Sequence, residues 1–227
     1  MTNPKADADI TSQSTGSPTI DVVDRHITEW LKLQSSLRED NRFFPPSSEW
    51  AEKMISASVS RRSGLEVGTP VFRARINGGD RMRMPLQRHE MGANPMAPPG
   101  RLNPEGIPCL YLSFDSPTAL AEMRPWPGAR VSVAEGTTTK PLSIADLSGQ
   151  VSKALDSDGI MALLLAELVG RPVHQEDPLE YLTTQYLAQG LKRGRLDGVK
   201  FRSAVTPEGI NLALFDTTAV GFKDVSL

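Results

Sequence analysis

Short stretches in which apolar and polar residues alternate recur along this chain, interrupted at irregular intervals by stretches with helical spacing. Alternation of this kind places successive side chains on opposite faces of a strand. It occurs in residues 71–76, 109–114 and 130–134, and in a hairpin pattern formed by residues 198–205 and 211–215. Because strands and helices do not follow one another as a regular strand–helix–strand series, the sequence predicts an α+β fold rather than a doubly wound sheet.

Five stretches have the spacing or the flanking residues of helices. They are residues 21–40, a segment from Ser47 or Ser48 to about Ser60, a segment capped by Asp115 or Ser116, residues 157–169, and residues 178–194. The first twenty residues are polar and lack aromatic side chains, so we expect them to form a disordered arm. The chain is therefore divided into an arm (1–20), a small N-terminal helical extension (21–68) and a main domain (69–227).

The charge balance and the missing motifs argue against several functional classes. With 25 basic and 27 acidic residues, the chain has a formal net charge of −2 and no overall field that attracts nucleic acid or an anionic membrane. It contains no phosphate-binding glycine loop, and its three histidines are scattered and form no metal-binding motif. Cys109 is the only cysteine, so no intrachain disulfide is expected. We find neither a secretory signal pattern nor an apolar run long enough to span a bilayer, and we expect a cytoplasmic protein.

A series of short motifs follows in a defined order from residue 100 onward. They read GRLNPEG (100–106), LYLS (110–113), TALAE (118–122), EYL (180–182), DGV (197–199), FRS (201–203) and GINL (209–212). In order and spacing, this set resembles the RES domain family, which is named for a recurring arginine, glutamate and serine. The resemblance extends over residues 69–215, which is most of the chain that we expect to fold.

The resemblance implies a fold like that of ADP-ribosyltransferases, in which a split, twisted β-core forms a cleft for NAD⁺. Characterised members look like toxins that deplete NAD⁺ with phosphate or water as acceptor, which implies a toxin of a toxin–antitoxin pair. NAD⁺ would be a substrate, and no cofactor or metal is implied. An antitoxin protein and a second copy of the chain are the partners that this interpretation allows. Carried over residue by residue, the catalytic and substrate-binding set is Arg101, Tyr111, Glu122 and Ser203, with Arg73 as a looser match to a second basic position.

The reaction itself asks for groups of these types. Breaking the bond between nicotinamide and ribose develops positive charge on the ribose, which a carboxylate such as Glu122 can stabilise. Arginine forks such as those of Arg101 and Arg73 suit the oxygens of a diphosphate. Tyr111 is expected on the strand face opposite Leu110, Leu112 and Phe114, where its ring can pack on the ligand and its hydroxyl can orient it. Ser203 is expected on an apolar strand face, where its hydroxyl needs a partner.

Each of these residues also has an ordinary structural interpretation. Arg101 can pair with Glu105 in a surface turn, Glu122 can be a solvated helix residue, Tyr111 can be a half-buried strand aromatic, and Ser203 can simply hydrogen-bond to backbone. At the level of function, two alternatives to NAD⁺ glycohydrolysis or phosphorolysis stay open. One is transfer of ADP-ribose to a protein from the same cleft, and the other is a non-catalytic binding module that keeps the fold.

Overall fold

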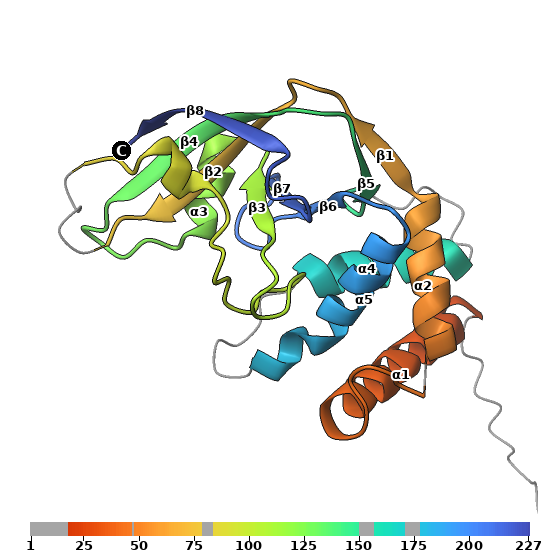
Figure 1. Ribbon diagram of the computed structural model, residues 1–227. Helices are drawn as coiled ribbons and strands as arrows, with labels where there is room; N and C mark the ends of the chain where they lie inside the picture. The colour runs from red at the N-terminus through yellow and green to blue at the C-terminus, as the bar shows by residue number, and fades with distance from the viewer. Residues whose placement is uncertain (1–17, 47, 79–83, 150–156, 171–177) are drawn as a thin grey trace, which may run out of the picture.

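The computed structural model describes residues 18–46, 48–78, 84–149, 157–170 and 178–227 (Figure 1). The elements are α1 (Pro18–Glu39), α2 (Ser48–Ser60), β1 (Arg62–Leu65), β2 (Pro70–Ile76), η2 (Arg88–Met91), β3 (Leu110–Ser113), α3 (Ser116–Glu122), β4 (Val131–Thr138), β5 (Leu142–Asp146), α4 (Ser157–Gly170), η3 (Pro178–Tyr181), α5 (Leu182–Arg193), β6 (Gly198–Arg202), β7 (Ile210–Leu214) and β8 (Val220–Ser226). The strands form one mixed sheet, in which only the β5–β6 pair is parallel among the described pairings. The predicted α+β class is confirmed.

The sheet opens near its middle, between β2 and β3. Its strand order is β1-β5-β6-β7-β3-β2-β4-β8. β2 pairs with β4 along its whole length, from Pro70 to Ile76, whereas β2 and β3 are joined only by the pair Phe72 and Ser113. Two neighbouring strands that meet at one position diverge elsewhere and leave space for side chains between them. This opening is where the cavity described below lies.

The two faces of the sheet pack against different partners. On one face, Leu110 and Leu112 of β3 are buried with Leu212 and Leu214 of β7. On the other face, strand residues such as Phe201 join a core with the helices α1, α2, α4 and α5. Figure 1 shows these four helices together on one side of the strands, while α3 lies beside β2 and β4. The predicted alternation in β3 is therefore confirmed, because Leu110 and Leu112 fill the core and Tyr111 faces the other way.

The N-terminal helices share a core with the sheet rather than standing apart from it. Leu33 of α1 and Met54 of α2 are fully buried in the cluster that contains the helix-facing strand residues. Helix α5 approaches α2 closely at Gly190, where a Cβ atom would lie 2.1 Å from Cδ1 of Ile55. Of the predicted arm, residues 1–17 lie outside the described residues, and residues 18–20 begin α1.

Three strands are absent from the sequence-based prediction, whereas α1 and α2 lie where the two N-terminal helices are predicted. β1 follows the second predicted helix, inside the segment 21–68, and pairs antiparallel with β5. β5 and β8 are also missing from the prediction, and β4 continues to Thr138 rather than ending at residue 134. In β1 only Leu65 is a large apolar residue, and the alternation of apolar and polar residues covers only 142–144 in β5 and 220–223 in β8, which is too short to identify a strand.

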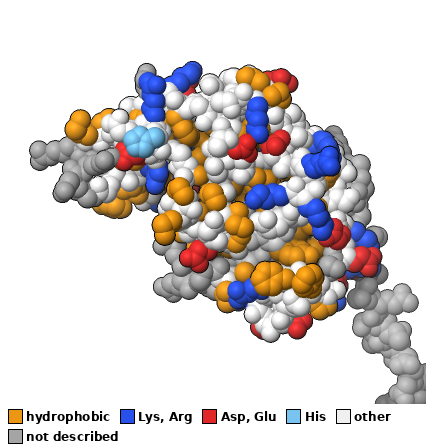
Figure 2. Space-filling view, in the orientation of Figure 1, with side chains coloured by type: hydrophobic (Ala, Val, Ile, Leu, Met, Phe, Trp, Pro, Cys, Tyr) orange, Lys and Arg blue, Asp and Glu red, His pale blue; other side chains and the backbone are white. Residues whose placement is uncertain are grey.

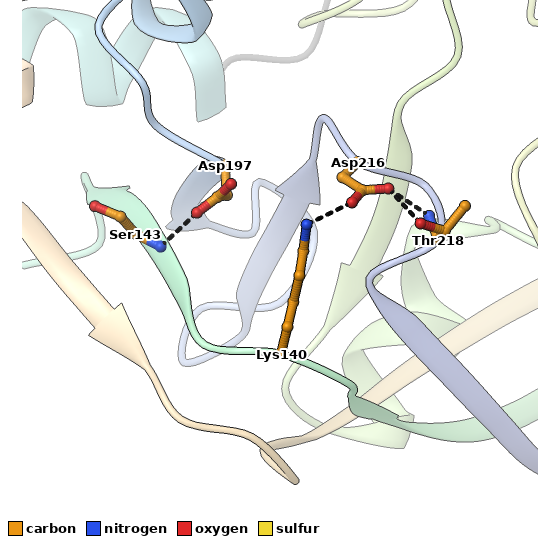
Figure 3. Close-up of polar contacts among 5 residues, drawn as sticks. All are labelled: Lys140, Ser143, Asp197, Asp216 and Thr218. Atoms are coloured by element: carbon orange, nitrogen blue, oxygen red, sulfur yellow. Dashed lines mark hydrogen bonds and ion pairs between the residues drawn. The ribbon is translucent and has the colours of Figure 1, made fainter.

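Two aspartates tie the strand ends together, as Figure 3 shows. The carboxylate of Asp197, just before β6, accepts a hydrogen bond from the backbone N–H of Ser143 in β5 at 2.7 Å. Asp216, just after β7, accepts from Lys140 Nζ at 2.6 Å and from both the backbone and the hydroxyl of Thr218. The hydrogen bonds from Lys140 and Thr218 lower the pKa of Asp216 to about 2. These contacts fix the start of β6 and the end of β7, and both strands contribute residues to the cavity lining.

Hydrophobic side chains gather on the surface over α1 and α5 in the face drawn in Figure 2. Leu31 of α1 is exposed, and so are Phe43 and Phe44 in the turn that follows this helix. The turn is ordered, because Oδ1 of Asn41 accepts hydrogen bonds from the backbone N–H groups of both phenylalanines. No helix in the described ranges is long and apolar enough to cross a membrane.

The single cysteine is predicted to be inert in the folded protein. Cys109 is buried, its Sγ–H donates to the carbonyl oxygen of Leu214 at 3.2 Å, and burial raises the pKa of its thiol to about 12. Because the thiolate is the reactive form, Ellman's reagent at about pH 8 should modify the native protein negligibly and should titrate the thiol in guanidinium. Rapid stoichiometric labelling of the folded protein would contradict this burial.

Candidate active site

A cavity of about 320 Å³ occupies the opening between β2 and β3. Its polar lining consists of Arg73, Arg101, Tyr111, Ser113, Glu122 and Asn211. Apolar side chains, among them Phe72, Met123 and Phe201, line the rest. Four of the five residues predicted from the sequence therefore line one cavity, although they come from β2, β3, α3 and a loop. Ser203 reaches the cavity indirectly, through its contact with Glu122.

Arg101 is anchored by the end of helix α4. Its Nη1 donates to the carbonyl oxygens of Val169 and Gly170, at 3.0 and 3.2 Å. The last carbonyls of a helix carry partial negative charge and have no partner within the helix, so a guanidinium is stabilised there. These contacts use Nη1 alone. The alternative in which Arg101 pairs with Glu105 is not what the structure shows.

The hydroxyl of Tyr111 holds the loop that carries Arg101. It donates to Oδ1 of Asn103 at 2.9 Å and accepts from the backbone N–H of Leu102 at 3.0 Å. Gln185 of α5 donates to the carbonyl oxygen of Gly100 at 2.8 Å, and a Cβ atom at Gly100 would lie 2.5 Å from Oδ1 of Asn103. Burial raises the pKa of Tyr111, so the phenol stays protonated and serves as the donor. The ring lines the cavity, but the hydroxyl is engaged with the loop rather than left for a ligand.

Replacing Tyr111 with phenylalanine should therefore destabilise the fold. The change leaves Oδ1 of Asn103 and the N–H of Leu102 without this partner, which costs about 1–3 kcal/mol of unfolding free energy. Urea denaturation measures the difference. Tyr186→Phe is the matched control, because the Tyr186 hydroxyl makes no hydrogen bond within the described residues, and its effect should stay within about 0.5 kcal/mol. Equal stability of Tyr111→Phe and wild type would mean that the loop does not depend on this hydroxyl.

Glu122 is held by donors from two distant strand ends. Helix α3 begins at its cap Asp115, whose carboxylate accepts from the N–H of Thr118 at 2.7 Å, and Glu122 is its last residue. Oε1 of Glu122 accepts from Oγ of Ser203 at 2.7 Å and from Nδ2 of Asn211 at 2.6 Å. Glu122 is thus not the freely solvated helix residue of the alternative interpretation.

Ser203 has its hydrogen-bonding partners inside the protein. Its hydroxyl donates to Glu122 and accepts from the backbone N–H groups of Val205 and Thr206, each at 3.0 Å. This uses its one donor and both acceptor positions. In this geometry Ser203 fixes Glu122 and the turn after β6, whereas the sequence suggests that a ligand supplies its partner.

Asn211 and Ser113 are not among the site residues predicted from the sequence. Oδ1 of Asn211 accepts from Oγ of Ser113 at 2.8 Å, and both side chains are buried. Both residues lie in segments that carry the family resemblance, and both are polar at the ends of otherwise apolar strands. A buried polar side chain at such a position needs a polar partner. That signal could have added them to the predicted set.

The cavity combines two arginines with one carboxylate. Arg73 donates from Nη1 to the carbonyl oxygen of Tyr111 at 3.0 Å, across the opening where β2 and β3 no longer pair. Burial, assisted by the neighbouring Arg75, lowers the pKa of Arg73 to about 10, so it stays charged at neutral pH. Within the described ranges, neither Arg73 nor Arg101 forms an ion pair with an acidic side chain. The cavity therefore has a net positive formal charge and suits an anionic ligand.

Comparison with known proteins agrees with the motif pattern. The model of the RES domain family matches residues 71–226, which is more than half of the chain. The chain belongs to the RES domain family. The match includes β8, which lies beyond residues 69–215, the segment over which the motif resemblance extends. Among solved structures, the chain is similar to one in the crystal structure of the M. tuberculosis MbcT–MbcA toxin–antitoxin complex. The two chains are 15% identical, the TM-score is 0.47, and the match covers 77% of this chain and 91% of the other. A search of curated proteins found no significant match.

Proposed function

We propose that this RES-domain protein consumes NAD⁺ by cleaving the bond between nicotinamide and ribose, with water or phosphate as acceptor. The observation that supports this most is the hydrogen bonding of the Glu122 carboxylate. Its Oε1 is saturated by donors from Ser203 and Asn211, and Oε2 has no protein donor among the described residues. A carboxylate fixed in this way, in a cavity that two arginines also line, suits a ligand that is anionic at one end and becomes cationic at the other.

The proposed reaction breaks the C1′–N bond heterolytically. The electron pair goes to the nicotinamide nitrogen and neutralises its pyridinium charge, so the leaving group needs no proton. Positive charge develops on the ribose, and Glu122 stabilises it electrostatically. Water or phosphate then adds at the ribose carbon that carried nicotinamide, giving ADP-ribose with release of a proton, or ADP-ribose 1″-phosphate.

The other polar residues have complementary roles in this proposal. Arg101 and Arg73 bind the diphosphate, and the Tyr111 ring with the apolar wall packs against nicotinamide or its ribose. A cavity of about 320 Å³ is at the small end for a ligand site and suits the nicotinamide riboside half. The adenosine half then extends past the described lining.

Depletion of NAD⁺ harms the cell that contains the enzyme. We therefore extend the proposal to a toxin that acts in the cytoplasm and is controlled by an antitoxin protein. The support for this step is the family resemblance. Neither a membrane nor nucleic acid is part of the proposal.

One experiment tests the chemistry directly. The purified protein is incubated with NAD⁺ with and without inorganic phosphate, and the products are resolved by NMR. Release of nicotinamide with ADP-ribose supports hydrolysis, and a phosphorylated ADP-ribose that requires phosphate supports phosphorolysis. If NAD⁺ stays intact and does not bind, the proposal fails. Nicotinamide release accompanied by ADP-ribose on a protein side chain, detected by mass spectrometry, would instead indicate a protein ADP-ribosyltransferase.

A further inference from the structure

A chain of hydrogen bonds leads from the opening of the sheet to Glu122, and its donors all point in one direction. Oγ of Ser113 donates to Oδ1 of Asn211 at 2.8 Å, and Nδ2 of Asn211 donates to Oε1 of Glu122 at 2.6 Å. An ionised carboxylate only accepts hydrogen bonds, so it must face the amide NH₂ group, and the amide oxygen must face the serine. The direction of this series of hydrogen bonds follows from the negative charge of the carboxylate at its end.

The two inner members of this chain are set firmly in the sheet. Ser113 is 2% exposed and Asn211 5% exposed, and the two residues are directly opposite in the β3–β7 pair. Ser113 is also the residue through which β3 pairs with β2, at Phe72. Its backbone is therefore held on both sides, at the point where the sheet opens into the cavity.

We propose that Ser113 and Asn211 are positioning residues that act through Glu122, with Ser203 as the second donor to the same oxygen. Two donors on Oε1 fix the rotation of the carboxylate and leave Oε2 as the oxygen that approaches the ribose. This inference rests on the proposed cleavage of NAD⁺ and assigns roles to two residues that need not touch the substrate. Because Ser113 and Asn211 are buried and both hydrogen bonds run toward a carboxylate, each hydrogen bond strengthens the next.

A kinetic cycle tests the proposal. Ser113→Ala should lower kcat for NAD⁺ cleavage by about tenfold, and Asn211→Leu, which keeps the branching of the side chain but has no donor, by about a hundredfold. KM should change by less than about twofold in both, because substrate binding and transition-state stabilisation are separate quantities. In a Glu122→Gln background, Ser113→Ala should have no further effect on kcat. A residue with only a structural role would lower activity in both backgrounds.

The protein contains a second buried serine–asparagine hydrogen bond, which provides a control. Ser132 of β4 is fully buried and donates to Oδ1 of Asn77 at 2.7 Å, which is the same serine–asparagine contact away from the cavity lining. The Ser132 hydroxyl also accepts from the backbone N–H of Leu86 at 2.9 Å, so Ser132→Ala should lower the melting temperature at least as much as Ser113→Ala but should leave kcat unchanged.

The outcomes separate this inference from the proposed function. If wild type leaves NAD⁺ intact, the proposed function fails and the positioning role fails with it. If wild type cleaves NAD⁺ but Ser113→Ala keeps its full kcat, only the positioning role is wrong. The same holds if Ser113→Ala lowers kcat by one and the same factor in the wild-type and Glu122→Gln backgrounds.

Discussion

Replacement of Glu122 by glutamine is expected to lower kcat for NAD⁺ cleavage by about 10²–10³, the range found when one preorganised electrostatic group is removed from an active site. The substitution removes the negative charge that stabilises the developing ribose cation. It keeps a carbonyl oxygen that can still accept from Ser203 and Asn211, so the unfolding free energy should fall by less than about 1 kcal/mol. Steady-state kinetics and thermal denaturation of the same preparation measure the two effects.

A second glutamate provides the control for this experiment. Glu135 of β4 is exposed and pairs with Lys223 at 3.3 Å on the surface. Such pairs contribute about 0–1 kcal/mol, and Glu135→Gln should leave kcat unchanged. Wild-type turnover in Glu122→Gln would show that the carboxylate has no part in the reaction, whatever the other residues do.

Gly198→Ala is expected to produce the largest loss of stability among the glycine substitutions at strand positions. A Cβ atom at the start of β6 would lie 2.3 Å from the backbone carbonyl oxygen of Ala213 and 2.9 Å from Cδ2 of Leu214. A carbonyl within a paired strand cannot move away as a flexible side chain can. We expect the free energy of unfolding to fall by about 3 kcal/mol, measured in urea.

Gly64→Ala is the control for Gly198→Ala. Gly64 also lies in a strand, β1, but no atom would come within 4 Å of the added Cβ. Its effect should stay within about 0.5 kcal/mol. Because β6 carries Phe201 and leads to Ser203, Gly198→Ala should also lower turnover. If the two variants were equally stable, the tight packing of β6 against β7 would not hold.

Local patterns in the sequence predicted the parts of the fold that depend on neighbouring residues. The alternation in β3 separated Leu110 and Leu112 from Tyr111, and the Asp115 cap with Pro117 in the first turn located α3. The same approach failed for β1, β5 and β8. In these three strands the alternation of apolar and polar residues is too short to identify a strand, so only the pairing partner defines it.

The sequence by itself determined the α+β class, membership of the RES family, and which residues to consider at the site. It could do so because helix and strand periods and motif spacings are properties of short segments and of their order. Only the tertiary structure decided what each polar group contacts. Ser203 and Glu122 are 81 residues apart in the chain, and Asn211 and Glu122 are 89 apart. Hydrogen bonds act over about 3 Å, so a partner is defined only once strands and helices from distant segments have packed together.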